Sequence, residues 1–373
     1  MAPTPNKKFK VLVVEDSAFM RKILENIFNG DAQFTVAGHA KDGREAVALA
    51  ESLKPDLITM DINMPHMDGL QATAQIMTTN PRPIVIVSSE SKEGAASTLK
   101  ALELGAIEFI AKPSSGVDLD MQSVKDELLR KSRMAAKVRV VRTASRLASS
   151  VQSLKSEAAP SIPVRRPAQT TASDQRCPVV VLAASTGGPA TVMRLAPGFT
   201  RDFPAAVFLV QHMPATFTTQ YAAQLAEFTS IRVKEAESNE SVQPGTLYIC
   251  PGGQHLRVAA SGRIQLDAKS GRVNGYLPNI DIAMESVAAY AGPMSIAVVL
   301  TGMGNDGTNG AKAIKSAGGL VLAQDEATCV IFGMPAEALK AGVVDQVLAI
   351  DDIYPAIEKR VITLCKATPV GVK

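Results

Sequence analysis

The chain has 373 residues, which favours two domains, and its 46% hydrophobic and 20% charged residues are typical of a folded globular protein. No apolar run approaches the roughly 18 residues that a membrane-spanning helix needs, so we expect no membrane insertion. The opening MAPTPNKKFK has no apolar stretch of signal-peptide length, which predicts a cytoplasmic protein. The four cysteines lie far apart and show no zinc-binding spacing.

Residues 8–128 alternate strand and helix patterns and predict a first α/β domain. Asp16 and Ser17 lie where they can cap the first helix. Five strands with helices between them predict a doubly wound parallel sheet. We expect strands at 9–15, 34–40, 56–62, 83–89 and 106–113, and helices after Ser17, at 42–54 and near 118–130.

Residues 129–176 differ in composition from the segments on either side. They are rich in Ser, Ala, Arg and Pro, and they carry eleven Lys and Arg residues against two acidic ones. Their apolar periodicity is weak. We expect the preceding helix to continue past residue 130 into a flexible linker. A solvated tether explains the positive charge better than a nucleic-acid contact does.

Residues 177–366 alternate again and predict a second α/β domain with a doubly wound sheet. Residues 257–273 are instead typical of a β-hairpin with a Ser-Gly turn. We expect strands at 179–185, 205–212, 246–252, 295–302 and 318–325, and helices near 214–228, 279–291, 307–317 and 335–341.

Polar residues follow the strands of the first domain, at the edge where doubly wound sheets bind ligands. They are Glu15 and Asp16 after the first strand, Asp61 after the third, Ser88 after the fourth and Lys112 after the fifth. Each position alone is more simply a helix cap or a loop residue, but the five together are not. Packed carboxylates need a cation, and oxygen ligands at a small site favour Mg²⁺. A carboxylate beside the metal can attack a phosphoryl donor, whose oxygens Ser88 and Lys112 can hold.

The first domain resembles response-regulator receivers in the stretches VLVVEDS, TMDINMPHMDG, VSSE and AKP. The resemblance implies a flavodoxin-like fold and a phosphoryl group transferred to one aspartate. The residues it assigns are Asp61 as phospho-acceptor, Glu15, Asp16 and Asp61 as Mg²⁺ ligands, Ser88 as switch hydroxyl, Lys112 as phosphate contact and Phe109 as switch aromatic.

The stretch VVVLAASTGGP at 179–189 reads as a buried strand that opens into a tight loop before a helix. The loop suits either a phosphate held by backbone N–H groups or a nucleophile, Ser185, on a turn. Neither a G-x-x-x-x-G-K-[ST] nor a G-x-G-x-x-G pattern is present, which weakens the phosphate-binding interpretation.

A histidine and an acid follow two other strands of this domain. His212 ends the strand at 205–212, and Asp306 lies in TGMGNDG after the strand at 295–302. On one rim with Ser185, they predict a serine hydrolase in which His212 is the base and Asp306 orients it. The glycines beside Ser185 and the loop at 302–304 offer N–H donors for an oxyanion. The order Ser-His-Asp and the AASTG sequence argue against the α/β-hydrolase fold.

The second domain resembles the catalytic domain of chemotaxis protein-glutamate methylesterases in ASTGGP, QHMP, CPGGQHL and LTGMGNDG. The resemblance implies a Rossmann-like α/β fold that hydrolyses glutamate γ-methyl esters, and deamidates glutamines, on cytoplasmic helices of chemoreceptors. It implies activation by phosphorylation at Asp61, with the chemotaxis histidine kinase as donor and no cofactor for the ester chemistry. Thr186 and Met303 fall at positions that line the active site. His255 falls in the PGG-x-H-L loop, where a supporting and a structural role both remain open.

Two alternatives remain at this point. One is a transcriptional regulator with a receiver fused to a DNA-binding module, which the α/β pattern of 177–366 argues against. The other is a non-catalytic scaffold of the same fold, which the presence of Ser185, His212 and Asp306 argues against.

We also expect the unphosphorylated receiver to dock over the rim that carries Ser185, His212 and Asp306 and to block the substrate.

Overall fold

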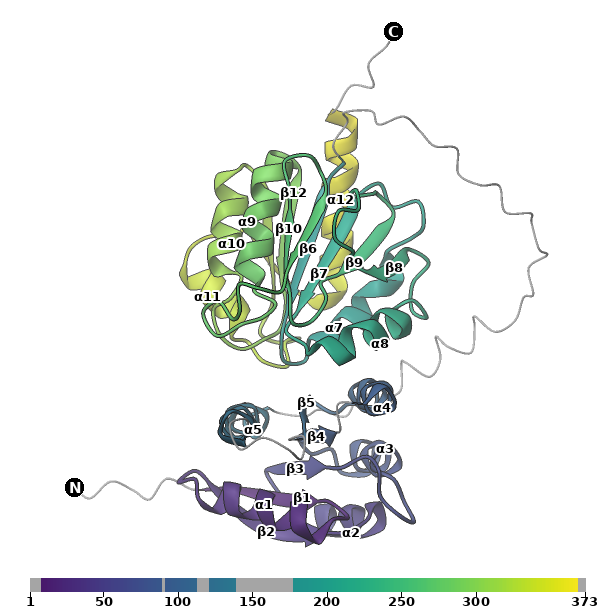
Figure 1. Ribbon diagram of the computed structural model, residues 1–373, viewed down its shortest axis with the longest axis vertical. Helices are drawn as coiled ribbons and strands as arrows, with labels where there is room; N and C mark the ends of the chain where they lie inside the picture. Colours follow the sequence, from purple (N-terminus) through teal and green to yellow (C-terminus); the bar gives the residue numbers. More distant parts are fainter. Residues whose placement is uncertain (1–7, 89–90, 113–120, 139–176, 368–373) are drawn as a thin grey trace, which may run out of the picture.

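Two α/β units follow one another along the chain, and Figure 1 shows them stacked along the long axis of the molecule. The computed structural model describes residues 8–88, 91–112, 121–138 and 177–367. Most of the expected linker, at 139–176, therefore lies outside the described residues. Within the described parts of the chain, no helix combines the length and the apolar character that crossing a membrane requires.

Five parallel strands form the sheet of the N-terminal unit, as the apolar runs predict. The middle strands are buried along their whole length because helices cover both faces of the sheet. The strands are β1 (Phe9–Val14), β2 (Phe34–Ala40), β3 (Leu57–Met60), β4 (Ile84–Ser88) and β5 (Glu108–Ala111), in the order β2-β1-β3-β4-β5.

The first four helices of this unit begin at residues whose side chains cap them. The Ser17 hydroxyl accepts a hydrogen bond from the Met20 N–H, as its place before the first helix predicts. The last helix continues to Ala135, beyond its expected core near 118–130, because Ala135 is fully buried against the sheet. One face carries α1 (Ala18–Asn29) and α5 (Met121–Ala135), and the other carries α2 (Gly43–Leu53), α3 (Gly69–Thr79) and α4 (Lys92–Glu103).

Seven parallel strands form the sheet of the C-terminal unit, two more than the sequence predicts. The two additional strands, RVKE and QVL, lie at the edges, where their residues are half-buried or exposed and form no apolar run. The strands are β6 (Val179–Ala184), β7 (Ala206–Gln211), β8 (Arg232–Glu235), β9 (Thr246–Ile249), β12 (Ser295–Val299), β13 (Leu320–Gln324) and β14 (Gln346–Leu348), in the order β14-β13-β12-β6-β7-β9-β8.

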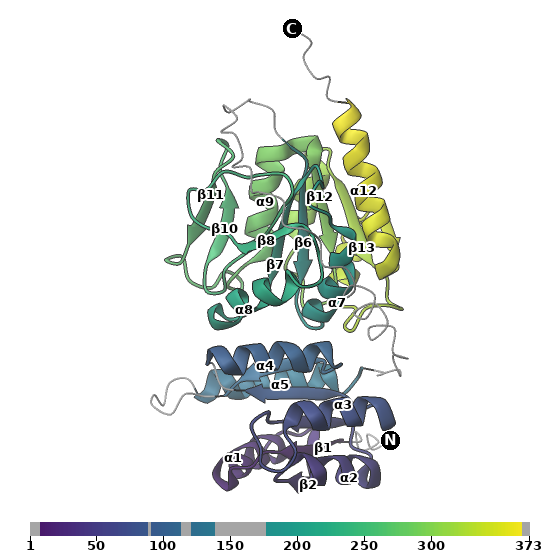
Figure 2. The same ribbon diagram turned by 90° about the vertical axis from the view of Figure 1, so that its right-hand side faces the viewer.

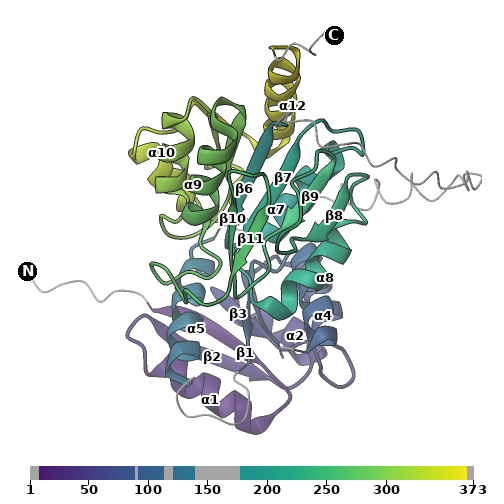
Figure 3. The same cartoon turned by 45° about the horizontal axis from the view of Figure 1, so that its top comes forward.

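Helices cover both faces of this second sheet, and Figure 3 shows α9 and α10 on one side of it. One face carries α7 (Gly188–Leu195), α8 (Ala215–Leu225) and α12 (Ile350–Ala367); the other carries α9 (Ile280–Ala291), α10 (Thr308–Ser316), α11 (Met334–Lys340) and a hairpin of β10 (His255–Val258) and β11 (Ile264–Asp267). Short 3-10 turns at Ala196–Gly198 and Gly292–Met294 follow α7 and α9.

The hairpin and the last helix differ in part from the expectations. The hairpin begins two residues earlier than predicted, and its turn is the expected Ser261-Gly262, with Gly262 at a φ of +71°. Helix α12 was not predicted. Its buried residues Ile350, Ile353 and Ile357 have helical spacing, but Pro355 within the segment argues against a helix from sequence alone.

The order of the second sheet positions the functional residues. Strand β6 lies between β7 and β12. The chain continues from β6 to β7 on one side, and the later strands from β12 onward lie on the other side, so a topological switch point forms at the carboxyl end of β6. The N-terminal unit faces this end of the sheet, and Figures 1 and 2 show α4 lying beside α7 and α8. The residues that follow β6 are therefore close to the other unit.

Candidate functional site

A hydroxyl, an imidazole and a carboxylate lie in line at the carboxyl end of the C-terminal sheet. Ser185 follows β6, His212 follows β7, and Asp306 lies in the loop between β12 and α10. Ser185 Oγ is 3.2 Å from His212 Nδ1, and His212 Nε2 is 2.8 Å from Asp306 Oδ2. The structure thus brings together the three residues to which the sequence assigns the nucleophile, the base and the orienting acid.

These hydrogen bonds assign the tautomer of His212. A carboxylate only accepts hydrogen bonds, so the proton belongs on Nε2, which leaves Nδ1 to accept the Ser185 hydroxyl. Chymotrypsin-like proteases use the two ring nitrogens in the opposite sense. The pairing is chemically equivalent, because in both cases one nitrogen faces the hydroxyl and the other faces the acid.

Asp306 is held by the beginning of α9 as well as by the histidine. It is 3% exposed, its Oδ2 accepts from the Ile280 N–H at 2.8 Å, and its Oδ1 accepts from the Asp281 N–H at 3.0 Å. A helix N-terminus favours negative charge because its first N–H groups have no partner within the helix. The carboxylate that faces His212 is therefore fixed in both position and orientation.

Asp281 completes the link between α9 and the loop that carries Asp306. Its Oδ1 accepts hydrogen bonds from the N–H groups of Gly307 and Gly310, at 2.9 and 2.8 Å, where α10 begins. Burial raises the pKa of Asp281, and the nearby Asp306 charge adds to this, while the Gly310 and Gly307 N–H groups oppose it. The N-terminus of α9 thus binds Asp306, and the N-terminus of α10 binds Asp281 of α9, so the loop that carries Asp306 is tied to α9 on both sides.

Two glycines allow the loops around Ser185 to approach one another. Gly187 has a φ of +76°, a conformation that side chains other than glycine rarely adopt. A Cβ on Gly302 would lie 2.7 Å from the Cβ of Ser185, so only glycine fits there. The Gln211 side chain donates a hydrogen bond to the Ser185 carbonyl at 2.8 Å and steadies the same turn. The hydroxyl is therefore presented on a tightly packed turn.

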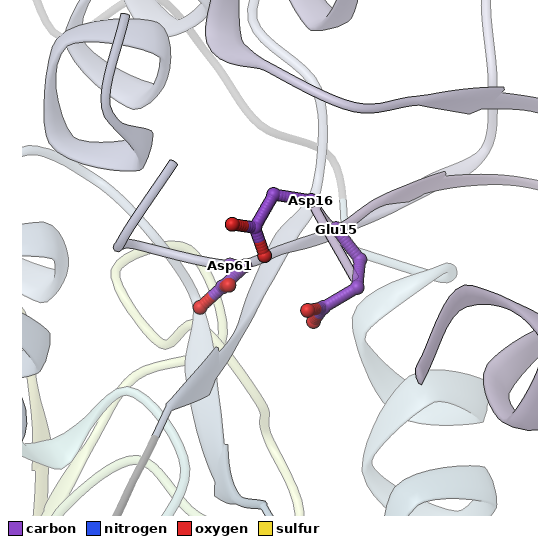
Figure 4. A group of neighbouring side chains, drawn as sticks. All are labelled: Glu15, Asp16 and Asp61. Atoms are coloured by element: carbon purple, nitrogen blue, oxygen red, sulfur yellow. The ribbon is translucent and has the colours of Figure 1, made fainter. Parts of the chain in front are cut away.

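A second cluster of polar residues lies at the carboxyl end of the N-terminal sheet. One carboxylate oxygen from each of Glu15, Asp16 and Asp61 lies within 4.8 Å of the others, and Figure 4 shows the three side chains around a common space. Lys112 Nζ is 2.9 Å from Glu15 Oε2 and 2.9 Å from Asp61 Oδ2. The sequence predicts this grouping, and its carboxylates fit a small divalent cation such as Mg²⁺.

The electrostatics of this cluster indicate crowded negative charge. Burial raises the pKa of Glu15, and the charge of Asp61 adds to it, while Lys112 opposes the shift. Burial alone would lower the pKa of Lys112, but its hydrogen bonds to Asp61 and Glu15 outweigh burial and raise it. The fifth predicted residue, Ser88, is buried at the end of β4, where its hydroxyl donates to the Gly94 carbonyl at 3.3 Å.

Known proteins match the chain over most of its length. Residues 11–124 match the response regulator receiver domain, and residues 180–357 match the CheB methylesterase family. A protein-glutamate methylesterase/protein-glutamine glutaminase of Pyrococcus horikoshii is 41% identical over 364 residues, which cover 96% of this chain and 95% of the relative. Its counterpart in Halalkalibacterium halodurans is 39% identical and covers 95% of this chain and 98% of that protein. The chain belongs to the protein-glutamate methylesterase/protein-glutamine glutaminase family.

The family assignment confirms the resemblance inferred from the sequence motifs, so the chain is an enzyme, a hydrolase with a receiver domain. The alternative of a receiver fused to a DNA-binding module does not hold. A crystal structure of the Thermotoga maritima CheB methylesterase catalytic domain, 40% identical, covers 50% of this chain and 99% of that domain with a TM-score of 0.47. We refer below to the receiver domain and the methylesterase domain.

The receiver contacts the methylesterase domain next to Ser185. The Thr186 hydroxyl donates to Glu108 Oε2 in strand β5 of the receiver at 2.7 Å, and Thr186 is 4% exposed. Arg130 of α5 lies 3.6 Å from the sulfur of Met303. Thr186 and Met303, the two residues that the resemblance places along the active site, therefore both lie against the receiver.

Phe109 anchors the apolar part of this contact. Its ring stacks on Phe217 of α8, with centroids 4.4 Å apart and planes at 26°, and the pair belongs to one continuous buried cluster. Lys131 lies 5.1 Å from the centre of the Phe109 ring and donates to the Phe109 carbonyl at 2.9 Å. Burial opposes the charged form of Lys131, but Glu108 and Glu127 outweigh it and raise its pKa. The Phe109–Phe217 stack and the Thr186–Glu108 hydrogen bond thus join the domains, and Lys131 supports the receiver side of the contact.

His255 lies outside the Ser185–His212–Asp306 group, although its sequence context left a supporting role open. It is 1% exposed, its Nε2 donates to the Gly271 carbonyl at 2.8 Å, and its Nδ1 accepts from the Asn279 N–H at 3.1 Å. Asn279 caps α9, the helix whose N-terminus holds Asp306. His255 therefore joins the hairpin to the start of α9.

Sequence reasoning missed Asp281, Glu108 and Tyr276, each of which contacts the residues described above. Glu108 could have been noticed in the sequence, because a charged residue is unusual inside a strand-like run such as AIEFIA. Asp281 is harder to notice, because an acid in the first turn of a helix capped by Asn279 is a common feature of helices. Tyr276 lies in a loop without a motif, and only the fold reveals what it contacts.

Proposed function

We propose that the methylesterase domain hydrolyses glutamate γ-methyl esters, and deamidates glutamines, on the cytoplasmic helices of chemoreceptors. The hydrogen-bonded chain from Ser185 through His212 to Asp306 at the switch point of the sheet is the observation that carries the proposal. The names of the relatives give the same two activities. Such substrates imply that the protein works in the cytoplasm.

We assign the chemical steps to the three residues. Ser185 Oγ attacks the ester carbonyl carbon as its proton moves to His212 Nδ1, and the imidazolium then protonates the departing methoxide, which leaves as methanol. Water attacks the acyl-enzyme with His212 again as base, and Ser185 is released with glutamate as product. A glutamine substrate loses ammonia in place of methanol. Asp306 holds the ring and stabilises the imidazolium through Nε2.

The oxyanion of the tetrahedral intermediate needs N–H donors close to Ser185. The Gly188 N–H is bonded to the Ser185 carbonyl and the Gly302 N–H to the Ile331 carbonyl. We therefore assign the oxyanion contacts to backbone N–H groups among residues 186–187 and 303–304. Thr186 and Met303 of these pairs also face the receiver.

A methyl-esterified receptor fragment tests the proposed activity directly. We expect the full-length protein to release methanol from it, and to convert selected glutamines to glutamate, in proportion to enzyme concentration. A fluorophosphonate probe should label Ser185 in the same preparation. Labelling of Ser185 without methanol release would show an active serine hydrolase with a different substrate. The absence of both labelling and methanol release would favour the non-catalytic scaffold.

Asp306→Asn should lower kcat by about 10⁴-fold, the order seen when an orienting aspartate of a protease becomes asparagine. The nucleophile remains, but the amide no longer stabilises the imidazolium or selects the tautomer of His212. Methanol release at saturating substrate measures the effect, with thermal unfolding as a control for the caps that Asp306 gives α9. A folded variant with nearly full activity would exclude this role for Asp306.

We propose that the receiver, expected at residues 8–128 and extended by helix α5 to Ala135, controls the methylesterase domain, residues 177–366, across the linker that follows α5. In this proposal Asp61 accepts a phosphoryl group from the chemotaxis histidine kinase. Glu15, Asp16 and Asp61 would hold Mg²⁺, which supplies positive charge that neutralises the phosphoryl oxygens. The cluster of three carboxylates and the bridging Lys112 support this assignment. Ser88 and Lys112 would hold the transferred group, and Phe109 would report it to the interface.

We also propose that the unphosphorylated receiver blocks the substrate. The contacts of the receiver residues Glu108 and Arg130 with Thr186 and Met303, two residues near Ser185, support this proposal. Phosphorylation adds about −1.5 to −2 charges at the end of β3. A shift of a few kcal/mol in the docked state is enough to change its population severalfold or more.

Phe109→Ala should raise the basal esterase rate of the full-length protein by about 10-fold, because the stack on Phe217 stabilises only the docked state. Methanol release without any phosphoryl donor measures it. Phe19→Ala is the matched control, since Phe19 is 74% exposed on α1, and we expect it to leave the basal rate unchanged. A folded Phe109→Ala protein with the wild-type basal rate would argue against occlusion.

A further inference from the structure

Tyr276 lies flat against the imidazole of His212. The two ring centroids are 4.4 Å apart and the ring planes differ by 13°. Tyr276 belongs to the segment between β11 and α9, where its backbone N–H and carbonyl pair with those of Val273 at 3.0 Å in both directions. Its hydroxyl packs against Gly304, where an added Cβ would lie 2.2 Å from it. The phenol ring therefore contacts both Gly304, in the loop that carries Asp306, and the His212 imidazole.

The stack supplies a constraint that the hydrogen bonds of His212 do not. Ser185 and Asp306 bind the two ring nitrogens in the plane of the imidazole. Two contacts of this kind still allow the ring to tilt about the line that joins the nitrogens. A second ring packed on the face removes that tilt, and its electron-rich surface also favours the imidazolium that forms when the Ser185 proton is transferred.

We propose that Tyr276 is a positioning residue that holds the His212 imidazole in its productive plane during ester hydrolysis. The inference rests on the roles proposed above for Ser185 and His212. It assigns the effect to the aromatic face and not to the hydroxyl, because the face is what contacts the imidazole. An aromatic residue without a hydroxyl should therefore serve nearly as well, whereas an aliphatic residue of similar bulk should not.

Full-length Tyr276→Phe, Tyr276→Leu and Tyr276→Gln proteins test this assignment. We expect the Leu and Gln variants to lose about 10-fold in kcat on a methyl-esterified receptor fragment with KM nearly unchanged, and the Phe variant to retain most of the rate. The rate at which a fluorophosphonate labels Ser185 should fall by the same factor, since it needs the base but no receptor. Tyr354→Leu, a loss of aromatic surface remote from His212, is the matched control and should label at the wild-type rate.

NMR of the His212 ring protons gives a readout that fold stability alone does not move. The upfield ring-current shift caused by Tyr276 should persist in the Phe variant and disappear in the Leu and Gln variants. Wild-type labelling rates in both non-aromatic variants would overturn the proposal. So would a rise in KM alone, which would mark a substrate contact, or equal loss in the Phe and Leu variants, which would assign the effect to the hydroxyl. Because labelling and NMR need no receptor, those two readouts stand even if the substrate proposed above is wrong.

Discussion

Ser185→Ala should abolish methanol release from methylated receptor, with a loss of at least about 10⁴-fold in kcat. Only the oxygen that attacks the ester is removed, while the turn around it keeps its hydrogen bonds from Gln211 and Gly188 to the backbone carbonyl. The protein should therefore fold normally. Methanol release and thermal unfolding, measured on the same preparation, separate the loss of the nucleophile from a loss of structure.

Two further variants make this result specific. His212→Gln should lose nearly as much activity, because no other described side chain is hydrogen-bonded to the Ser185 hydroxyl. Ser230→Ala removes a hydroxyl from an exposed residue of the same domain and should change nothing. Near-normal methanol release by Ser185→Ala would show that another group is the nucleophile.

Asp61→Asn should prevent the receiver from taking up a phosphoryl group from acetyl phosphate. The variant lacks the carboxylate oxygen that attacks the donor and one of the three carboxylates that would hold Mg²⁺. Incorporation of labelled phosphoryl groups measures the first effect. The esterase rate with and without acetyl phosphate measures the second: we expect acetyl phosphate to raise the rate of the wild-type protein and to leave that of Asp61→Asn unchanged.

Removal of Mg²⁺ and a control variant test the assignment of Asp61 further. Chelation of Mg²⁺ should abolish incorporation into the wild-type receiver, and return of the metal should restore it. Glu51→Gln removes an exposed carboxylate of α2, remote from the cluster, and should incorporate normally. Undiminished incorporation in Asp61→Asn would assign the acceptor role to another acid.

The sequence predicted most of the fold because the buried strands are apolar along their whole length and their ends carry polar residues. Val179–Ala184 is an example: all six residues are buried, and the next residue is Ser185. The edge strands β8 and β14 were not predicted because an edge strand is partly exposed to solvent, so neither RVKE nor QVL has the apolar sequence of a core strand. Burial decides whether a strand is visible in a sequence.

The same reasoning explains what was predicted of the site. Residues that follow parallel strands converge at one edge of the sheet, so the strand pattern alone was enough to group Ser185 with His212. Asp281 and Tyr276 act through contacts between segments that are distant in the chain, with α10 and with His212. Neither belongs to a local motif, because their contribution depends on how α9 and the hairpin pack.

Strand β5 connects the contact with the methylesterase domain to the acidic cluster of the receiver. Glu108 and Phe109 lie in it and touch the methylesterase domain, while Lys112 directly follows it and bridges Glu15 and Asp61. If a phosphoryl group at Asp61 weakens the docked state, thermodynamic linkage requires that a receptor segment bound at Ser185 favour the phosphorylated receiver by the same free energy. A receptor rich in methyl esters would then favour the phosphorylated state of the receiver, and demethylation of the receptor would weaken that preference.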